Sequence, residues 1–267
     1  MVFKRFYLFL LIIGFLFIPD PGACSENAGD SHFYFVQITD THFGEHDHLG
    51  RTKTAVKMIN MLPMEIKCVV HTGDITMDKI LDKDVLAPAL TEMKKISVPV
   101  HYVPGNHDIL MEKPDSTGRV YTDNFGSLIS KAEYEGVIFL FVYTEPLRKK
   151  FTLKDYRPFE QLEEFLIKSD GKPVILFHHA PSVDDFYNNK MHPGWKKEIR
   201  DKWTALLNEH NVKAVIAGHF HRDEHHWLGN VPLYVSAPVA GYWKRQATFR
   251  IYEYRDGKVG YRTQYVE

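Results

Sequence analysis

Along the chain, short runs of apolar residues mostly alternate with stretches in which apolar residues recur at the spacing of a helix. The short runs predict buried strands, whereas apolar residues three and four positions apart, as at Ala55, Met58, Ile59 and Leu62, predict helices. The expected strands cover residues 33–39, 68–71, 98–103, 137–143, 174–177 and 214–217. The expected helices cover 52–62, 85–96, 159–168 and 196–208, with Pro88 in or near the first turn of the second.

The last part of the chain changes to strands without helices between them, expected at 233–236, 248–254 and 260–265. Asp256-Gly257 between the last two is typical of a two-residue hairpin turn. Alternating units followed by a run of strands predict an α/β fold, in which helices cover mixed sheets and two sheets pack together. No repeat or low-complexity linker interrupts residues 32–267, so we expect one domain there.

The N-terminal segment differs in kind from the rest. Lys4 and Arg5 precede an apolar run over residues 6–18, which prolines and a glycine then break. This order is typical of a secretory signal, and the run is shorter than the roughly 20 residues that a membrane span needs. We therefore expect a signal peptide over 1–23, a flexible leader over 24–31, and an exported protein in the periplasm, outside the cell or on a lipid anchor. An uncleaved anchor or a buried helix is the alternative.

Cys24 directly follows this segment, at a position that resembles a bacterial lipoprotein cleavage site. Pro21 stands where that pattern favours leucine. A lipid on Cys24 would tether the protein to a membrane, and the alternative is an incidental cysteine near an ordinary cleavage point. The only other cysteine, Cys68, lies in an apolar stretch and is expected to be a small buried hydrophobe. Two such cysteines make no disulfide framework.

Composition narrows the possible partners. The chain has a formal net charge of −1, so no bulk basic field favours nucleic acid or an anionic membrane. An anionic substrate must therefore be held by local groups. The 15 histidines stand out, because imidazole is the commonest metal ligand and the usual acid or base near neutral pH.

Polar side chains follow five of the expected strands. The segments are Asp40-Thr41-His42, Gly73-Asp74, Gly105-Asn106-His107-Asp108, His178-His179 and Gly218-His219-Phe220-His221. Each alone is typical of a turn or a helix cap. Together they place carboxylate, amide and imidazole groups at successive strand ends, where α/β sheets form their sites, and such N and O ligands suit divalent metals. The glycines before Asp74, Asn106 and His219 allow sharp turns and keep bulk away from the site.

These segments resemble the calcineurin-like metallophosphoesterase superfamily, whose pattern reads D-x-H, G-D, G-N-H-[DE], H and G-H-x-H in that order. All five elements are present between Asp40 and His221. The resemblance implies a four-layer α/β/β/α sandwich with a dinuclear metal centre at the carboxyl ends of the strands. It also implies hydrolysis of phosphate mono- or diesters by a hydroxide that bridges two divalent ions, which can be Mn, Fe, Zn, Ni or Mg.

The same resemblance implies the ligands. Asp74 would bridge both ions, and each ion would have three further ligands: Asp40, His42 and His221 on one, and Asn106, His178 and His219 on the other. His178 is preferred over His179 because the single histidine of the family pattern comes directly after the apolar strand. His107 would stand beside the ions as the catalytic acid or base without binding them. Asp108 is expected to orient a neighbour or close the turn.

The motifs of this chain differ from those of two known branches of the family, which narrows the branches that it can resemble. Met77 stands where purple acid phosphatases have a tyrosine, and protein Ser/Thr phosphatases have a phosphate-binding arginine after the second motif that this chain lacks. The pattern is most similar to the branch with cyclic-nucleotide phosphodiesterases and other small-substrate phosphohydrolases. Three segments are candidates for substrate contacts: 111–125, 182–195 and 242–245.

The sequence leaves open both the substrate of an enzyme and a role without catalysis. The expected substrate is a small phosphate ester, with a nucleotide or a lipid headgroup both open. A tether at Cys24 would favour a phosphodiesterase acting on a phospholipid or a lipid-linked pyrophosphate. A non-catalytic metal-binding scaffold is the alternative from another class, and the intact His107 argues against it. No P-loop or Rossmann glycine pattern suggests a nucleotide cofactor.

Overall fold

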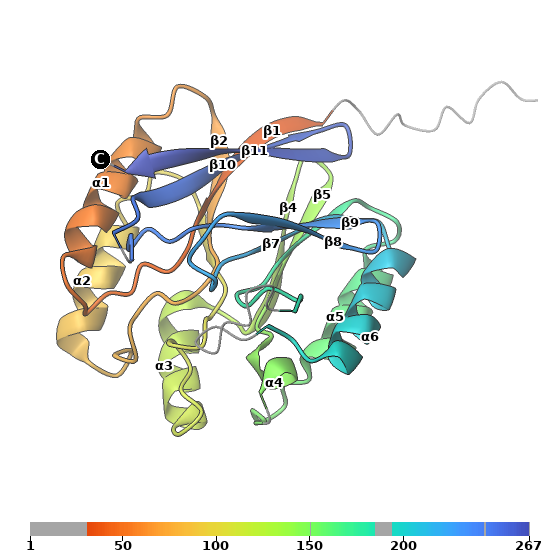
Figure 1. The fold of residues 1–267 in the computed structure, drawn as a ribbon, viewed down its shortest axis with the longest axis horizontal. Coiled ribbons are helices and arrows are strands. Elements are labelled where there is room, and N and C mark those ends of the chain that lie inside the picture. Colours follow the sequence, from red (N-terminus) through yellow and green to blue (C-terminus); the bar gives the residue numbers. More distant parts are fainter. Residues whose placement is uncertain (1–30, 150, 185–193, 243, 267) are drawn as a thin grey trace, which may run out of the picture.

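The computed structural model describes residues 31–149, 151–184, 194–242 and 244–266. Two mixed sheets pack face to face in this part of the chain (Figure 1). The first sheet has the order β11-β10-β1-β2-β3, from β1 (His32–Ile38), β2 (Ile66–His71), β3 (Val100–Tyr102), β10 (Ala247–Arg255) and β11 (Lys258–Val266). The second has the order β4-β5-β6-β7-β9-β8, from β4 (Ile129–Tyr134), β5 (Val137–Val142), β6 (Val174–Phe177), β7 (Val212–Ala217), β8 (Glu224–Leu228) and β9 (Val231–Val235).

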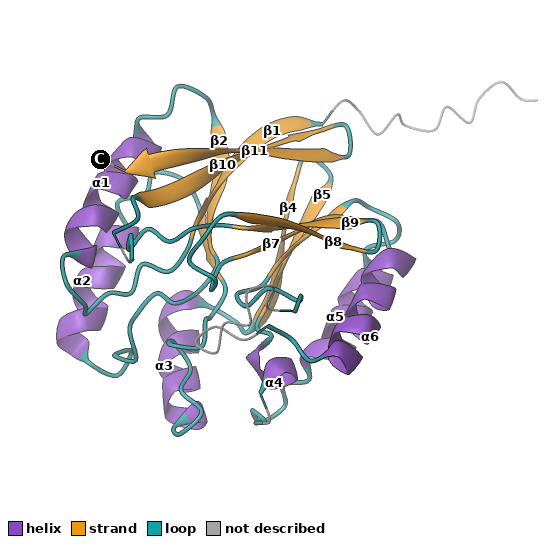
Figure 2. Ribbon diagram, in the orientation of Figure 1, coloured by secondary structure: helices purple, strands orange, loops and turns teal. Residues whose placement is uncertain are grey.

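Helices cover the outer face of each sheet (Figure 2). Helices α1 (His48–Asn60) and α2 (Lys83–Met93) pack on the first sheet, and α5 (Pro158–Lys168) and α6 (Lys197–Glu209) pack on the second. The shorter α4 (Glu145–Arg148) follows β5, and α3 (Pro114–Phe125) lies beyond β3 in the chain. The predicted fold class, a four-layer α/β/β/α sandwich of mixed sheets, is confirmed.

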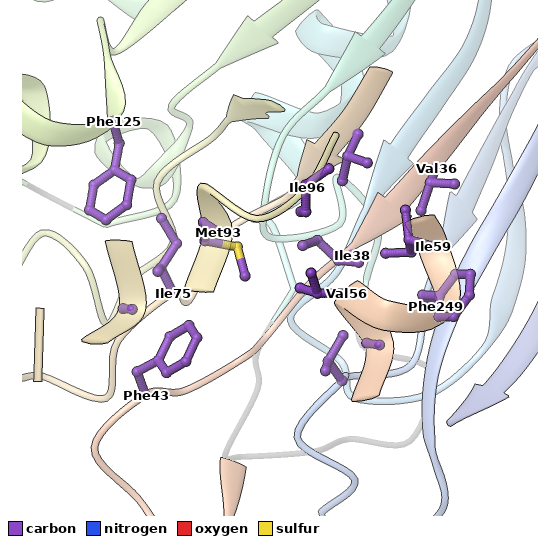
Figure 3. Close-up of a cluster of buried hydrophobic side chains, with 14 of the residues drawn as sticks. Val36, Ile38, Phe43, Val56, Ile59, Ile75, Met93, Ile96, Phe125 and Phe249 are labelled. Carbon is purple, nitrogen blue, oxygen red and sulfur yellow. The ribbon is translucent and has the colours of Figure 1, made fainter. Parts of the chain in front are cut away.

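Three buried apolar clusters fill the spaces between the four layers. Between the sheets the cluster is largely aromatic, with Phe35 stacked on Tyr252 and in edge contact with Phe139. The cluster between the first sheet and its helices, shown in Figure 3, joins Val36 and Ile38 of β1 to Ile59 of α1 and Met93 of α2. Along a strand, alternate side chains face opposite layers, so each sheet is apolar on both faces.

Parallel pairing brings the strand ends of the predicted motifs to one edge. Strands β1, β2 and β3 run parallel, as do β5, β6, β7 and β9. Strands β10, β4 and β8 are antiparallel to their neighbours β1, β5 and β9. The carboxyl ends of the parallel strands therefore form one polar edge in each sheet.

Several predicted details differ from the structure. Residues 114–125 form α3, in which Tyr121 and Phe125 are buried, although the sequence predicted no helix in this polar segment and marked 111–125 only for substrate contacts. Strands β4 and β8 were not predicted, because their edge positions leave polar residues half-buried and the apolar alternation weak. Helix α2 begins at Lys83, so Pro88 lies inside it rather than in or near its first turn.

Other details agree. Asp256 and Gly257 both have positive φ, 48° and 78°, and Arg255 pairs with Lys258, so the predicted two-residue hairpin is present. Cys68 is buried, as expected. The expected signal peptide over 1–23 and the candidate lipid site Cys24 lie outside the described residues and stay predictions. No helix among the described residues has the length and apolar character to cross a bilayer.

A buried polar side chain ties the two sheets together next to the polar edge. The amide nitrogen of Gln37, on β1, donates to the Thr72 hydroxyl at 2.8 Å and to the Ala217 carbonyl of β7 at 2.9 Å. The Tyr252 hydroxyl donates to the amide oxygen of Gln37 at 3.0 Å. These groups are buried, so water cannot readily replace a bond lost with Gln37. The Ala217 carbonyl also accepts from the Ser236 N–H, and the Tyr252 hydroxyl also accepts from Arg250.

We expect Gln37→Leu to lower the free energy of unfolding by about 1–3 kcal/mol, because three buried groups each lose a hydrogen bond that water cannot readily replace. Urea denaturation of metal-free protein, followed by circular dichroism, measures this change. Gln264→Leu, on the edge strand β11, is the matched control and should stay within about 0.5 kcal/mol of the parent. Equal shifts of the two variants would show that the bridge contributes little.

Candidate metal centre

The predicted polar segments meet at the carboxyl edge of the two sheets. Their side chains form two buried groups that share Asp74: Asp40, His42, Asp74 and His221 in one, and Asp74, His179 and His219 in the other. Within each group the candidate ligand atoms all lie within 4.8 Å of one another. Asp40, His42 and Asp74 follow strands of the first sheet. The other three residues follow strands of the second sheet: His179, His219 and His221.

The first group places two imidazoles against two carboxylates within a few ångströms. The Nε2 atom of His221 lies 3.0 Å from Oδ1 of Asp40 and 3.2 Å from Nε2 of His42. The same His42 atom lies 3.9 Å from Oδ2 of Asp74. Burial alone would raise the pKa of Asp40, but His221 and His42 hold that pKa well below its usual value. The group therefore favours a positive charge at its centre.

The second group has the same character. The Nδ1 atom of His179 donates to the Thr72 carbonyl at 2.7 Å, so in the neutral ring the lone pair is on Nε2. That atom lies 3.1 Å from Oδ2 of Asp74, and two acceptors at this distance need a cation or a proton between them. Burial opposes protonation, yet the Asp74 carboxylate raises the pKa of His179 to about 9. A divalent metal in place of that proton would satisfy both acceptors.

The structure brings His179, rather than the predicted His178, to this site. His178 points into the layer between the second sheet and α6, where its ring lies 5.7 Å from that of Trp195 and 5.6 Å from that of Trp203. Strand alternation explains the difference, because Leu176 faces the helices and Phe177 faces the other sheet. His178 continues the first face and His179 the second. Burial in the helix layer lowers the pKa of His178 to about 3.

Asn106 fits a metal ligand by a different observation. Its side-chain oxygen is buried and has no hydrogen-bond partner among the described residues. The neighbouring His107 backbone N–H donates to Oδ1 of Asp74 at 2.9 Å, which places this loop against the shared carboxylate. A buried acceptor without a donor is costly in a native protein, and a cation would compensate it.

The backbone is strained where the candidate ligands lie. Asp40, His42, Asp74, His219 and His221 have φ values of 52°, 45°, 54°, 67° and 53°. Residues other than glycine rarely adopt this left-handed region, and each costs about 1–3 kcal/mol in a sparsely populated conformation. Such strain clusters at functional sites, where the surrounding structure enforces it.

Glycines leave room for the ligands, as predicted. A Cβ atom on Gly105 would lie 2.0 Å from Oδ1 of Asp74, and one on Gly218 would lie 2.6 Å from Oδ2 of Asp40. Only Gly73 of the three has a positive φ, 102°. At Gly105 and Gly218 the glycine is therefore required for close approach rather than for its backbone conformation.

His107 lies at the mouth of the site with a partner that sequence reasoning missed. Its Nδ1 atom lies 2.8 Å from Oδ1 of Asp78, and its ring packs edge-on against His42 at 5.4 Å between centroids. Its side chain is 26% exposed, whereas those of Asp40 and Asp74 are almost completely buried. Burial lowers the pKa of His107, but Asp74 and Asp78 outweigh that effect and raise it.

Asp108 has the orienting role expected of it. It accepts hydrogen bonds from the backbone N–H groups of Gly105, Ile75 and Thr76 at 2.9, 3.1 and 2.9 Å. These bonds tie the loop after β2 to the loop after β3. Asp74 and Asn106 are thereby fixed relative to each other.

Comparison with known proteins agrees with this geometry. Residues 33–223 match the family model for calcineurin-like phosphoesterases. The chain belongs to this family. The matched span contains both groups of candidate ligands and His107, and the family comprises metal-dependent phosphoric ester hydrolases.

Relatives in the family carry two kinds of name. The serine/threonine-protein phosphatase CPPED1 of Mus musculus is 23% identical, over 78% of this chain and 75% of its own length. A probable cyclic nucleotide phosphodiesterase of Colwellia psychrerythraea is 25% identical, over 71% of each chain. The structure of a dimetal phosphatase from Danio rerio superposes with a TM-score of 0.62 at 16% identity, covering 88% of this chain and 99% of that one. This structure shows the shared fold.

We expect Gly105→Ala to lower the bound metal, because the new methyl group would displace the carboxylate or the backbone of Asp74. The metal-to-protein ratio after gel filtration, measured by elemental analysis, tests this expectation. Gly260→Ala is the matched control, since its Cβ would meet no other atom within 4 Å. A Gly105→Ala protein with the parental metal ratio would show that the site tolerates the displacement.

Proposed function

We propose that this protein hydrolyses small phosphate mono- or diesters at a centre of two divalent metal ions. The observation that carries the proposal is the convergence of buried His and Asp side chains around Asp74, in two groups that could each hold a metal ion. Metals that accept N and O ligands suit this donor set, which leaves Mn, Fe, Zn, Ni and Mg as candidates.

Seven residues would hold the ions in this proposal, with Asp74 shared: Asp40, His42 and His221 for one ion, and Asn106, His179 and His219 for the other. Two such ions polarise a phosphoryl oxygen and lower the pKa of a water from about 15.7 to about 7. The Asp74 carboxylate, placed in both groups, would reduce the repulsion between the two positive charges. Asp108 and the glycines would keep it in that place.

His107 would transfer the proton in this reaction. Its ring is next to His42 but outside both ligand groups, and it is the accessible histidine at the mouth of the site. Protonated, it can donate to the oxygen of the leaving group, and Asp78 would orient the ring for that step. This role separates a catalyst from a scaffold, which needs the ligands but not this histidine.

Relatives guide the choice of ester. The printed names include cyclic nucleotide phosphodiesterases, which favours cyclic nucleotides as the first diesters to test. We also propose that the protein acts after export, on the basis of the N-terminal pattern and Cys24. A lipid headgroup is the competing substrate in that setting.

We expect His179→Ala to lose one of the two ions and Asp74→Asn to lose both. His178→Ala is the matched control, because it removes the neighbouring imidazole from the opposite face of β6. It should keep both ions while lowering the midpoint of thermal unfolding. Elemental analysis of each protein measures the outcome, and metal loss in His178→Ala but not in His179→Ala would reverse the assignment.

We expect His107→Ala to lower kcat by about 10²- to 10⁴-fold on bis-p-nitrophenyl phosphate while both ions stay bound, because it removes proton transfer and no ligand. Asp78→Asn should lower kcat less, since the histidine remains. Steady-state kinetics with elemental analysis of the same samples provides both readouts.

An activity screen of the wild-type protein distinguishes an enzyme from a metal-binding scaffold. We expect turnover when it is loaded with metal and offered phosphomonoesters, cyclic nucleotides and phospholipid headgroups in parallel. A protein that holds two ions and turns over none of these ester classes would favour the scaffold. Turnover confined to lipid substrates would favour the membrane-tethered alternative.

A further inference from the structure

Tyr242, in the loop between β9 and β10, packs against two candidate ligands of the same ion. Its ring is stacked on His221, with centroids 4.9 Å apart and planes within 3° of parallel. It also meets His42 nearly edge-on, at 5.1 Å and 79°. The tyrosine thus contacts the two imidazoles whose Nε2 atoms face each other at 3.2 Å.

A second set of contacts holds Tyr242 in place. Its hydroxyl donates to Oε2 of Glu45 at 2.8 Å, across 197 positions of sequence. The His48 ring lies edge-on to it at 5.1 Å, and Nδ1 of His48 donates to the His42 carbonyl at 2.9 Å. The loop after β1 and the loop after β9 are therefore joined around the tyrosine ring.

The orientation of an imidazole decides whether it binds a metal. The lone pair of Nε2 lies in the plane of the ring, so the ion must lie in that plane as well. Stacking fixes the plane of His221, and the edge contact restricts rotation of His42. Neighbours that orient metal ligands in this way typically change metal affinity by about 10- to 100-fold.

The second ligand group is held differently. His179 is fixed by its hydrogen bond to the Thr72 carbonyl, and its ring packs edge-on against His219 at 4.9 Å. In the described part of the chain, the ring contacts of Tyr242 are with His42, His48 and His221. The two ion positions therefore differ in what surrounds them.

We propose that Tyr242, anchored by Glu45, is a positioning residue that selectively tightens the ion held by Asp40, His42 and His221. This inference rests on the two-metal centre of the proposed function. It gives a role to one of the segments, 242–245, that the sequence analysis marked for substrate contacts. Here the tyrosine acts through the ligands rather than on the substrate.

Titration of metal-free protein with Mn²⁺, followed by electron paramagnetic resonance of the free ion, counts the sites and gives each Kd. The wild type is expected to bind two ions. Tyr242→Ala should raise the Kd of one ion by about 10- to 100-fold and leave the Kd of the other unchanged. Tyr265→Ala, which removes an exposed tyrosine of β11, is the matched control and should change neither.

Two gentler variants keep the test valid if Tyr242→Ala folds poorly. Tyr242→Phe keeps the ring and loses the anchor, and Glu45→Ala removes the anchor from the other side. Each variant should lower the affinity for the same single ion by a smaller factor. The double variant should bind that ion no more weakly than either single variant, because both substitutions remove the same hydrogen bond. Additive losses would overturn the anchoring by Glu45.

Two results would overturn the inference alone: unchanged affinity for both ions in Tyr242→Ala, or an equal loss at both. A wild-type protein that binds fewer than two Mn²⁺ ions would instead overturn the two-metal centre, and this inference with it. The wild-type titration therefore separates the two failures.

Discussion

The organising constraint of this structure is the burial of two carboxylates, Asp40 and Asp74, among four imidazoles at one edge of the sheets. The Nε2 atom of His221 lies within hydrogen-bond distance of both Asp40 and His42, and Asp74 and His179 make a similar contact next to them. In a medium of low dielectric such a cluster is unfavourable unless positive charge fills it. The bonds to Asp108 fix the loops that carry this cluster, and the glycines leave room for its side chains. The local backbone strain is a further cost that the surrounding structure compensates.

Much of this could be predicted from the sequence, because the signals are local. Apolar runs that end in Asp, Asn or His mark strand ends, and parallel pairing brings those ends to one edge. The order of five motifs narrowed the family, and the glycine before Asn106 indicated close approach. The choice between His178 and His179 was only half determined by the sequence, because alternation separates the two rings but both faces of the strand are apolar. Only the structure shows that Leu176 faces the helices and Phe177 faces the other sheet, which places His179 with the other ligands.

The remainder depended on contacts that no local pattern encodes. Helix α3 is polar over most of its surface and is held through Tyr121 and Phe125, so its periodicity was too weak to stand out. Asp78 is near Asp74 in sequence, but only the turn between them aims it at His107. Tyr242 and Glu45 meet from opposite ends of the chain. A single sequence gives no means of pairing such distant residues.

The division of the ligands between the two sheets has a consequence for the molecule as a whole. Each ion of the proposed centre would have ligands from both sheets, so it would link the two sheets at their carboxyl edge. A ligand that binds only the folded protein adds about 2.7 kcal/mol to its stability at 100 times its Kd. Metal supply would then set how firmly the protein is closed, not only whether it can react.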